Sequence, residues 1–289
     1  MKPAPFDYHV PRSVEEATTL LASLENAKVL AGGQSLVPMM NFRYVIVDHI
    51  VDLAKVEGLA GISVTNGRMR IGAMTRQREL EFSPEVARHC PLMREALSHV
   101  GHRQTRNRGT IGGSLAHADP AAELPTVCAA YDAVIEIVSR RGIRKIPFHE
   151  FNLAFMTTAI EPDEIVTAIE LPLWASGHGY SFNEFSRRRG DFAIVGAATL
   201  IEIDPDLMVR RASLRLCGVG IGPLRITAAE AALVGKRFDR GTARAAATAV
   251  KAITPISDIH ASSDYRRHLA EVLTFRTLRD AAERCGIRI

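Results

Sequence analysis

Two pairs of adjacent glycines carry the clearest chemical signal in this sequence. One pair lies in the segment 31–35 (AGGQS), directly after a short apolar run, and the other lies in the segment 110–114 (TIGGS). Adjacent glycines allow backbone N–H groups to approach a phosphate closely, and the neighbouring hydroxyls add further donors. One such pair alone is typical of a tight turn. Two pairs with matching flanks predict two walls around a pyrophosphate.

Two carboxylates follow the second glycine segment. We expect Asp119 to cap a helix whose first residue is Pro120, which leaves Glu123 free. A carboxylate beside a nucleotide can accept hydrogen bonds from ribose or other hydroxyl groups.

Arginines form two clusters, one within 103–108 and one at 187–189. Most runs of this kind are solvated surface. The functional alternatives are neutralisation of phosphate beside the glycine segments and docking against an acidic partner subunit. Aromatic residues do not interleave with these clusters, so the sequence does not predict nucleic-acid binding.

Composition and cysteine spacing exclude several other classes. The 289 residues are 47% hydrophobic and 24% charged, and the net charge of +4 is too small to indicate nucleic acid or a membrane as partner. The four cysteines lie far apart, so we expect no metal on this chain, and no motif assigns it a catalytic residue. With no signal peptide and no membrane span expected, the interpretation is a cytoplasmic protein with reduced thiols.

Hydrophobic periodicity predicts an α+β chain. The capping box Ser13 to Glu16 starts a helix, a strand covers 27–31, and Asn66-Gly67 joins two strands of a hairpin. A linker is expected at 175–178. The other expected helices are 76–82, 84–99, 121–131 and three helices in the last 60 or so residues, and the other expected strands are 133–139, 165–171, 179–186, 192–203 and 211–219.

Four segments in chain order together resemble one known family. They are AGGQSLVPMM at 31–40, RNRGTIGGSLAHADPAAELP at 106–125, RRGDFAIVGAA at 188–198 and SSDYRRHLAEVL at 262–273. The family is the FAD-binding medium subunit of the molybdenum hydroxylases, which includes carbon monoxide dehydrogenase medium chains and the flavin segment of xanthine dehydrogenase. The similarity extends over nearly the whole chain.

The resemblance implies a fold and a division into domains. It implies an α+β FAD-binding fold of the p-cresol methylhydroxylase type over residues 1–175, with subdomains at about 1–55 and 56–175. Residues 178–289 would form a C-terminal domain of the carbon monoxide dehydrogenase flavoprotein type, a small sheet with helices.

The resemblance also implies which residues contact FAD. Gln34 replaces a histidine that is usual in carbon monoxide dehydrogenases, and residues 183–186 replace a lysine that several relatives carry near the flavin. Arg187 and Arg188 are the alternatives for that contact. The implied FAD-binding residues are Val29, Leu30, Ala31, Gly32, Gly33, Gln34, Ser35, Leu36, Thr110, Ile111, Gly112, Gly113, Ser114, Asp119, Glu123, Val166 and Asp191.

By the same resemblance the chain is one subunit of a larger oxidoreductase. It would pass electrons through FAD to an external acceptor, having received them from [2Fe-2S] clusters on a small subunit. Molybdopterin would lie on a large subunit, and the assembly would be a dimer of heterotrimers. Two alternatives stay open at this point. One is a self-contained FAD-dependent reductase or oxidase of the same fold, and the other is a non-catalytic nucleotide-binding or interaction protein.

Overall fold

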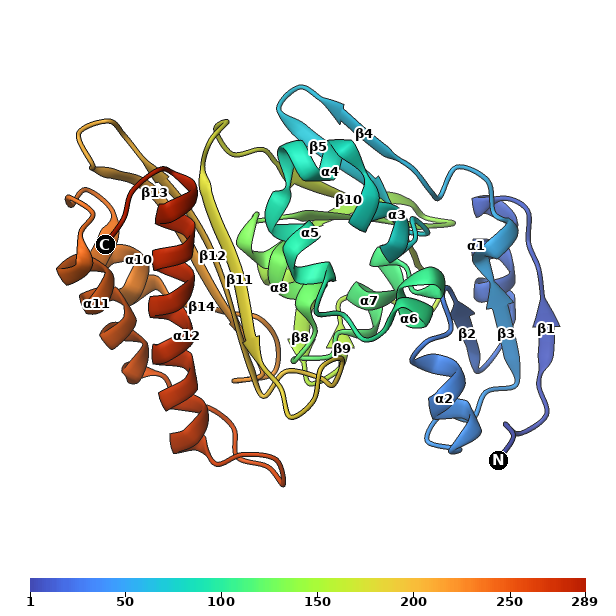
Figure 1. Cartoon of the computed structure of the whole chain (residues 1–289). Helices are drawn as coiled ribbons and strands as arrows, with labels where there is room; N and C mark the ends of the chain where they lie inside the picture. The colour runs from blue at the N-terminus through green and yellow to red at the C-terminus, as the bar shows by residue number, and fades with distance from the viewer.

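Three β-sheets succeed one another along the molecule, as Figure 1 shows for this computed structural model, which describes all 289 residues. The N-terminal sheet is parallel, with strand order β1-β3-β2, and its two helices pack beside it. The elements of this part are β1 (Asp7–His9), α1 (Val14–Ser23), β2 (Ala27–Leu30), α2 (Leu36–Asn41), β3 (His49–Asp52) and the short 3-10 helix η1 (Leu53–Lys55).

Ser13 caps α1 as predicted, but the reciprocal contact of the capping box is shifted by one residue, from the Ser13 N–H to the Arg12 N–H. The Ser13 hydroxyl accepts a hydrogen bond from the Glu16 N–H at 3.1 Å, and the Glu16 carboxylate accepts one from the Arg12 N–H at 2.7 Å. These contacts satisfy N–H groups that a helix start otherwise leaves unpaired. The strand that follows α1 lies at the edge of the sheet and is only partly buried. The first glycine segment follows the end of β2 and therefore lies near the surface.

The middle sheet is antiparallel, with strand order β4-β5-β10-β6-β7. The expected turn at Asn66-Gly67 joins its first two strands, and both residues have positive φ, as such a turn requires. The strands of this part are β4 (Ile62–Thr65), β5 (Arg68–Gly72), β6 (Val134–Ser139), β7 (Gly142–Pro147), β10 (Ile165–Pro172) and the small pair β8 (Asn152–Ala154) and β9 (Thr157–Thr158). Its helices are α3 (Gln77–Phe82), α4 (Pro84–His89), α5 (Pro91–Leu97), α6 (Arg103–Arg108), α7 (Ile111–His117), α8 (Glu123–Ala130) and α9 (Phe148–Phe151).

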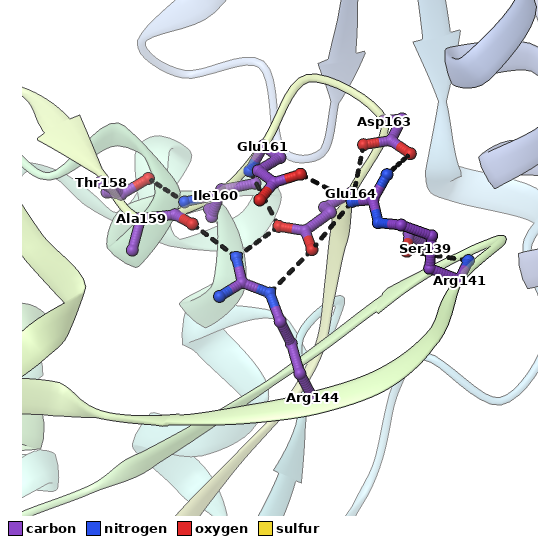
Figure 2. Close-up of polar contacts among 9 residues, drawn as sticks. All are labelled: Ser139, Arg141, Arg144, Thr158, Ala159, Ile160, Glu161, Asp163 and Glu164. Atoms are coloured by element: carbon purple, nitrogen blue, oxygen red, sulfur yellow. Dashed lines mark hydrogen bonds and ion pairs between the residues drawn. The ribbon is translucent and has the colours of Figure 1, made fainter.

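An ion-pair network fixes the turn that precedes β10 (Figure 2). The buried carboxylate of Glu164 accepts hydrogen bonds from Arg144 at 2.6 and 2.7 Å and from the backbone N–H of Glu161 at 2.8 Å. Arg141 adds ion pairs to Glu161 and Asp163. A bidentate guanidinium contact holds a carboxylate in a defined geometry, so the hairpin β6–β7 sets where the central strand β10 begins.

The C-terminal sheet is antiparallel and is covered on both faces. The helix α12 packs on β11 and β12, while α8 packs on β12 and β13 from the other side (Figure 1). Gly286, at φ +79°, follows α12 in the left-handed conformation expected of a helix terminator. The elements of this part are β11 (Gly179–Phe185), β12 (Val195–Ile203), β13 (Val209–Cys217), β14 (Leu224–Arg225), α10 (Thr227–Leu233), α11 (Arg240–Ala249), the 3-10 helix η2 (Val250–Ala252) and α12 (Ser263–Arg284).

Several predicted boundaries were wrong. The helix expected over 84–99 is two helices, because Pro91 has no N–H to continue the hydrogen-bond ladder and Cys90 ahead of it leaves the helical conformation. The helix expected over 121–131 begins at Glu123 with Ala122 as its cap. Asp119 instead accepts a hydrogen bond from the Ala121 N–H at 2.8 Å, within a turn ahead of the helix. The strand expected from residue 192 begins only at Val195, and the strand expected over 211–219 spans Val209–Cys217.

Candidate functional site

The two glycine segments meet in the structure. A Cβ atom added to Gly32 would lie 2.4 Å from the carbonyl oxygen of Arg108 and 2.7 Å from the Cα of Gly109. A Cβ atom added to Gly113 would lie 3.2 Å from the Cβ of Ala31. Contacts this short leave no room for side chains at either position. The absence of Cβ atoms therefore allows the two segments to lie directly against each other.

The first segment presents unpaired backbone donors. The N–H groups of Gly32, Gly33, Gln34 and Ser35 donate no hydrogen bond within the chain. Gly33 has φ +73°, and the Gln34 side chain donates back to the Gly32 carbonyl at 3.2 Å, which closes the turn. Successive free N–H groups around a left-handed residue are typical of an anion-binding loop. This donor set suits the phosphates of a dinucleotide.

The second segment is built differently, as the first turn of helix α7. Its N–H groups are already paired, with Gly112 donating to the Ala73 carbonyl at 2.8 Å and Gly113 donating to the Thr110 hydroxyl at 3.1 Å. A Cβ on Gly112 would lie 2.5 Å from the Cβ of Ala73. The glycines of this segment therefore serve close packing, between Ala73, directly after β5, on one side and the first segment on the other.

A pocket of about 190 Å³ opens at this junction. Its lining residues are Leu30, Ala31, Gly32, Gly33, Gln34, Val37, Asp52, Ala54 and Arg108. A smaller apolar pocket of about 60 Å³ adjoins it and shares Leu30 and Val37 with it. The first pocket thus combines free N–H donors with a guanidinium group, and the second offers only apolar surface.

Arg108 and the carboxylate of Asp52 both line the pocket, and Arg76 lies close to both of them outside the lining. The exposed guanidinium of Arg108 has no carboxylate partner, and Arg76 donates a hydrogen bond to the backbone carbonyl of Arg108. Burial, and next the neighbouring charge of Arg108, lower the pKa of Arg76. The two guanidinium groups outnumber the one carboxylate, Asp52, so a net positive charge remains here and favours an anion.

Sequence reasoning missed the place of Arg76. It lies far from the glycine segments in the chain and reaches them only because an isolated β-bridge pairs it with Thr110. Arg108 belonged to a predicted basic cluster, but its position in the chain did not distinguish it from its neighbours.

Of the remaining predicted residues only Leu30 lines the pocket. Val166 is buried on β10, and Asp119 lies in the turn before α8. Asp191 is exposed in the loop between β11 and β12, where the adjacent Gly190 packs against His102. Among the predicted residues of the first segment, Val29 and Leu30 end β2 and Leu36 begins α2.

Glu123 is buried at the start of α8 against the C-terminal sheet, with only 5% of its surface exposed. Burial, and next the negative charge of Glu184, raise its pKa to about 8. It therefore carries a proton at neutral pH.

A parallel N-terminal sheet, an antiparallel middle sheet and a glycine-lined anion pocket between them define a dinucleotide-binding flavoprotein fold. Residues 4–174 match the family described as "FAD binding domain in molybdopterin dehydrogenase", and residues 180–281 match "CO dehydrogenase flavoprotein C-terminal domain". The chain belongs to the FAD-binding medium subunits of the molybdenum hydroxylases, which are oxidoreductase flavoproteins. The α+β fold predicted from the sequence resemblance is confirmed.

Individual relatives match over their full length. The chain is 42% identical to the 6-hydroxypseudooxynicotine dehydrogenase complex subunit alpha of Paenarthrobacter nicotinovorans, over 98% of this chain and 97% of that protein. A solved structure of carbon monoxide dehydrogenase from Hydrogenophaga pseudoflava matches with a TM-score of 0.95 and 38% identity, over 99% of this chain and 100% of that one. Quinoline 2-oxidoreductase from Pseudomonas putida 86 matches with a TM-score of 0.95 and 37% identity, over 99% and 100%.

Proposed function

We propose that this chain is the electron-transfer subunit of a heterotrimeric molybdenum hydroxylase. In this proposal it receives electrons from [2Fe-2S] clusters on a small subunit and delivers them through FAD to an external acceptor. A large subunit carries molybdopterin and the substrate, and two heterotrimers associate. The observation that carries the proposal is the junction of the two glycine segments, where Arg108 and three residues with free N–H groups, Gly32, Gly33 and Gln34, line one pocket.

The proposed contacts of FAD follow from this geometry. The free N–H groups of residues 32–35 bind the pyrophosphate, Arg108 neutralises it, and residues 110–114 form the opposite wall. The hydroxyls of Ser35 and Ser114, which form no hydrogen bond within the chain, supply further donors. Bound FAD accepts electrons singly or in pairs, so it connects one-electron carriers with two-electron acceptors. The role of the protein is to hold the dinucleotide.

The relatives support a role in electron transfer rather than in substrate choice. Proteins named for carbon monoxide and for quinoline match this chain equally well, with TM-scores of 0.95 and identities of 38% and 37%. A subunit that selected the substrate would differ more between enzymes of such different chemistry. This argument favours the electron-transfer role over a self-contained reductase.

Domain boundaries and location complete the proposal. We place the FAD-binding domain at 1–175, with subdomains at about 1–55 and 56–175, and the C-terminal domain at 178–289, because each part contains one of the three large sheets. All four cysteines are free thiols, which suits the reducing cytoplasm. No helix has the length and apolar character needed to cross a membrane.

Two measurements test the proposal. The purified chain should be yellow and release one FAD on heating, and the native complex should contain an iron–sulfur and a molybdenum subunit. When the complex is reduced by its substrate, bleaching of the flavin absorbance should require the iron–sulfur subunit. A chain that with FAD alone turns over a small substrate at rates typical of enzymes would establish the self-contained reductase instead. A colourless chain that takes up no FAD would favour a non-catalytic binding protein.

A further inference from the structure

The two predicted arginine clusters lie side by side in the structure. Gly190, in the loop between β11 and β12, packs against the segment that precedes α6. A Cβ atom added to Gly190 would lie 2.6 Å from Cε1 of His102 and 3.1 Å from the carbonyl oxygen of Gly101. Helix α6 begins at the next residue. Two segments that are distant in the chain thus form one surface, called here the arginine surface, whose arginines are Arg103, Arg108, Arg187, Arg188 and Arg189.

Hydrogen bonds hold the loop between β11 and β12 in a defined shape. The N–H of Ile194 donates to the carbonyl of Phe185 at 2.7 Å and closes the base of the loop. Within the loop, the N–H of Asp191 donates to the carbonyl of Arg188 at 3.1 Å. Gly190 has φ +87°, a conformation that a tight turn of this kind uses and that side chains disfavour. Because the loop is ordered in advance, a partner that docks on it pays little conformational entropy.

The charges of the arginine surface are not balanced within the chain. All five arginines are exposed, and none forms an ion pair with an aspartate or glutamate. Arg106 on the same helix differs, because it is largely buried and pairs with Glu81 at 3.0 Å. With that pair set aside, the only carboxylate in residues 101–110 and 185–194 is Asp191, which leaves these segments a net charge of +4. The whole chain also has a net charge of +4, so its remaining residues are neutral on balance.

Exposed aromatic side chains border these arginines. Phe192, in the same loop, is 61% exposed, and Phe185 at the base of the loop is 39% exposed. The ring of Phe185 packs edge to face on Tyr265 of α12, with the ring centroids 6.1 Å apart. Arginine and aromatic residues are enriched at protein interfaces, and a guanidinium group can bind a carboxylate through two hydrogen bonds. The charge of this surface therefore fits an acidic protein, and its aromatic rim adds apolar contact.

The arginine surface begins at the flavin pocket. Arg108 lines that pocket and ends α6, and Arg103 begins the same helix. Six residues of helix span about 9 Å. A protein bound across α6 and the loop would therefore lie next to the proposed position of the dinucleotide, where it could exchange electrons with it.

We propose that the arginine surface docks an acidic electron-carrier protein, and that this carrier is the external acceptor. The identity of the partner as an acceptor rests on the proposed function. Transient electron-transfer partners meet through small, charged interfaces, whereas permanent subunits bury larger and more apolar ones. The predominance of charge here favours the acceptor over the iron–sulfur subunit. In each encounter the carrier takes up one electron, so two encounters reoxidise the reduced cofactor, and its protons pass to water.

Binding of soluble cytochrome b5, an acidic haem protein, tests the docking surface. The cytochrome is titrated into the full chain, with and without FAD, and binding is measured by calorimetry. We expect binding at low salt that weakens about tenfold or more in roughly 0.2 M salt, because the contact is between exposed charges. Arg103→Glu and Arg189→Glu, which both lie outside the flavin pocket, should each weaken binding at low salt about tenfold or more. Arg240→Glu is the matched control, since this exposed and unpaired arginine begins α11, across the C-terminal sheet from α6 (Figure 1), and it should leave binding unchanged.

Electron transfer to the same probe tests whether the surface leads to the flavin. The flavin of the loaded chain is reduced photochemically, and the chain is then mixed with oxidised cytochrome b5 in a stopped-flow instrument. The rate of haem reduction should fall in Arg103→Glu and Arg189→Glu in proportion to the loss of affinity. Cytochrome c, which is basic, should react faster with these two variants than with the native chain. A neutral quinone should react equally with all of them.

Four outcomes decide the proposal. Absence of cytochrome b5 binding at low salt, or unchanged binding in both variants, would overturn the docking surface. Loss of the iron–sulfur subunit from complexes of the two variants would show a permanent interface and overturn the acceptor assignment. A chain that binds the cytochrome through these arginines but takes up no FAD would contradict the proposed function and leave the docking surface standing. A chain that binds FAD normally and does not bind the cytochrome would do the reverse, and thermal unfolding midpoints show that each variant has folded.

Discussion

Replacing Gly32 by alanine tests the central geometry of the site. The new Cβ would lie 2.4 Å from the Arg108 carbonyl oxygen and 2.7 Å from the Gly109 Cα, and both of these atoms belong to the backbone. An ordinary contact begins at 3.4 Å, so the two segments must separate by about 1 Å. Backbone atoms cannot rotate out of the way as a flexible side chain does. The free N–H groups of residues 32–35 would then move relative to Arg108.

The expected cost follows from what the displacement breaks. Overpacking of this kind destabilises a protein by about 1–3 kcal/mol. Loss of one charge-assisted hydrogen bond to phosphate adds about 1.5–3 kcal/mol to the free energy of FAD binding. At 1.4 kcal/mol for each factor of ten, the dissociation constant of FAD should rise roughly 10- to 100-fold.

In the assay, FAD is titrated into the apoprotein, and binding is monitored by flavin fluorescence and by calorimetry. Gly220→Ala is the matched control, because a Cβ at Gly220 meets no atom within 4 Å and its φ is not positive. The control should bind FAD like the native chain and unfold at the same temperature. If Gly32→Ala binds FAD as tightly as the control, the two segments do not form the two walls of one site.

Three further outcomes are expected. Gly113→Val should abolish FAD retention, because its Cβ would lie 2.8 Å from the Thr110 hydroxyl that caps α7. Flavin absorbance per chain measures FAD retention. A variant with a full complement of flavin would contradict the prediction. Arg108→Ala should weaken FAD binding about tenfold or more and flatten its dependence on salt, whereas Arg103→Ala, on the same helix outside the pocket, should change neither. In the native chain the free energy of unfolding should fall by about 1 kcal/mol between pH 7 and 9, and Glu123→Gln should abolish this fall. The sign follows because the folded-state pKa is raised to about 8, so the proton stabilises the fold at lower pH and is lost as the pH rises; thermal unfolding midpoints across this range test it, and an unchanged slope would refute it.

Local rules predicted most of the elements from the sequence. The helix cap Ser13, the turn at Asn66-Gly67 and the terminator Gly286 each depend on a few adjacent residues, and each lies where expected. The errors at Pro91 and Asp119 have the same physical origin. Pro91 ends one helix and Asp119 forms a turn that delays the start of another. The spacing of apolar residues indicates neither effect.

Contacts between distant segments could not be predicted in this way. Arg76 reaches the site through a bridge to Thr110, which forms only when the two segments have folded together. No spacing along the chain encodes this contact. Arg76 also lacks a distinguishing neighbour in the sequence, so the structure alone identifies it.

The two glycine pairs are identical in sequence but have different physical roles. The pair at 32–33 leaves its N–H groups unpaired, and Gly33 has a conformation that side chains disfavour. The pair at 112–113 is helical, and its N–H groups are paired. An alanine is therefore harmful at 112 or 113 only through volume, whereas at 33 it is harmful through backbone conformation. At 113 the tightest contact is the Thr110 hydroxyl at 2.8 Å, so shortening Thr110 should relieve part of the crowding there, whereas at 112 the backbone oxygen and Cα of Ala73 lie 2.8 and 2.9 Å away and no substitution of Ala73 removes them.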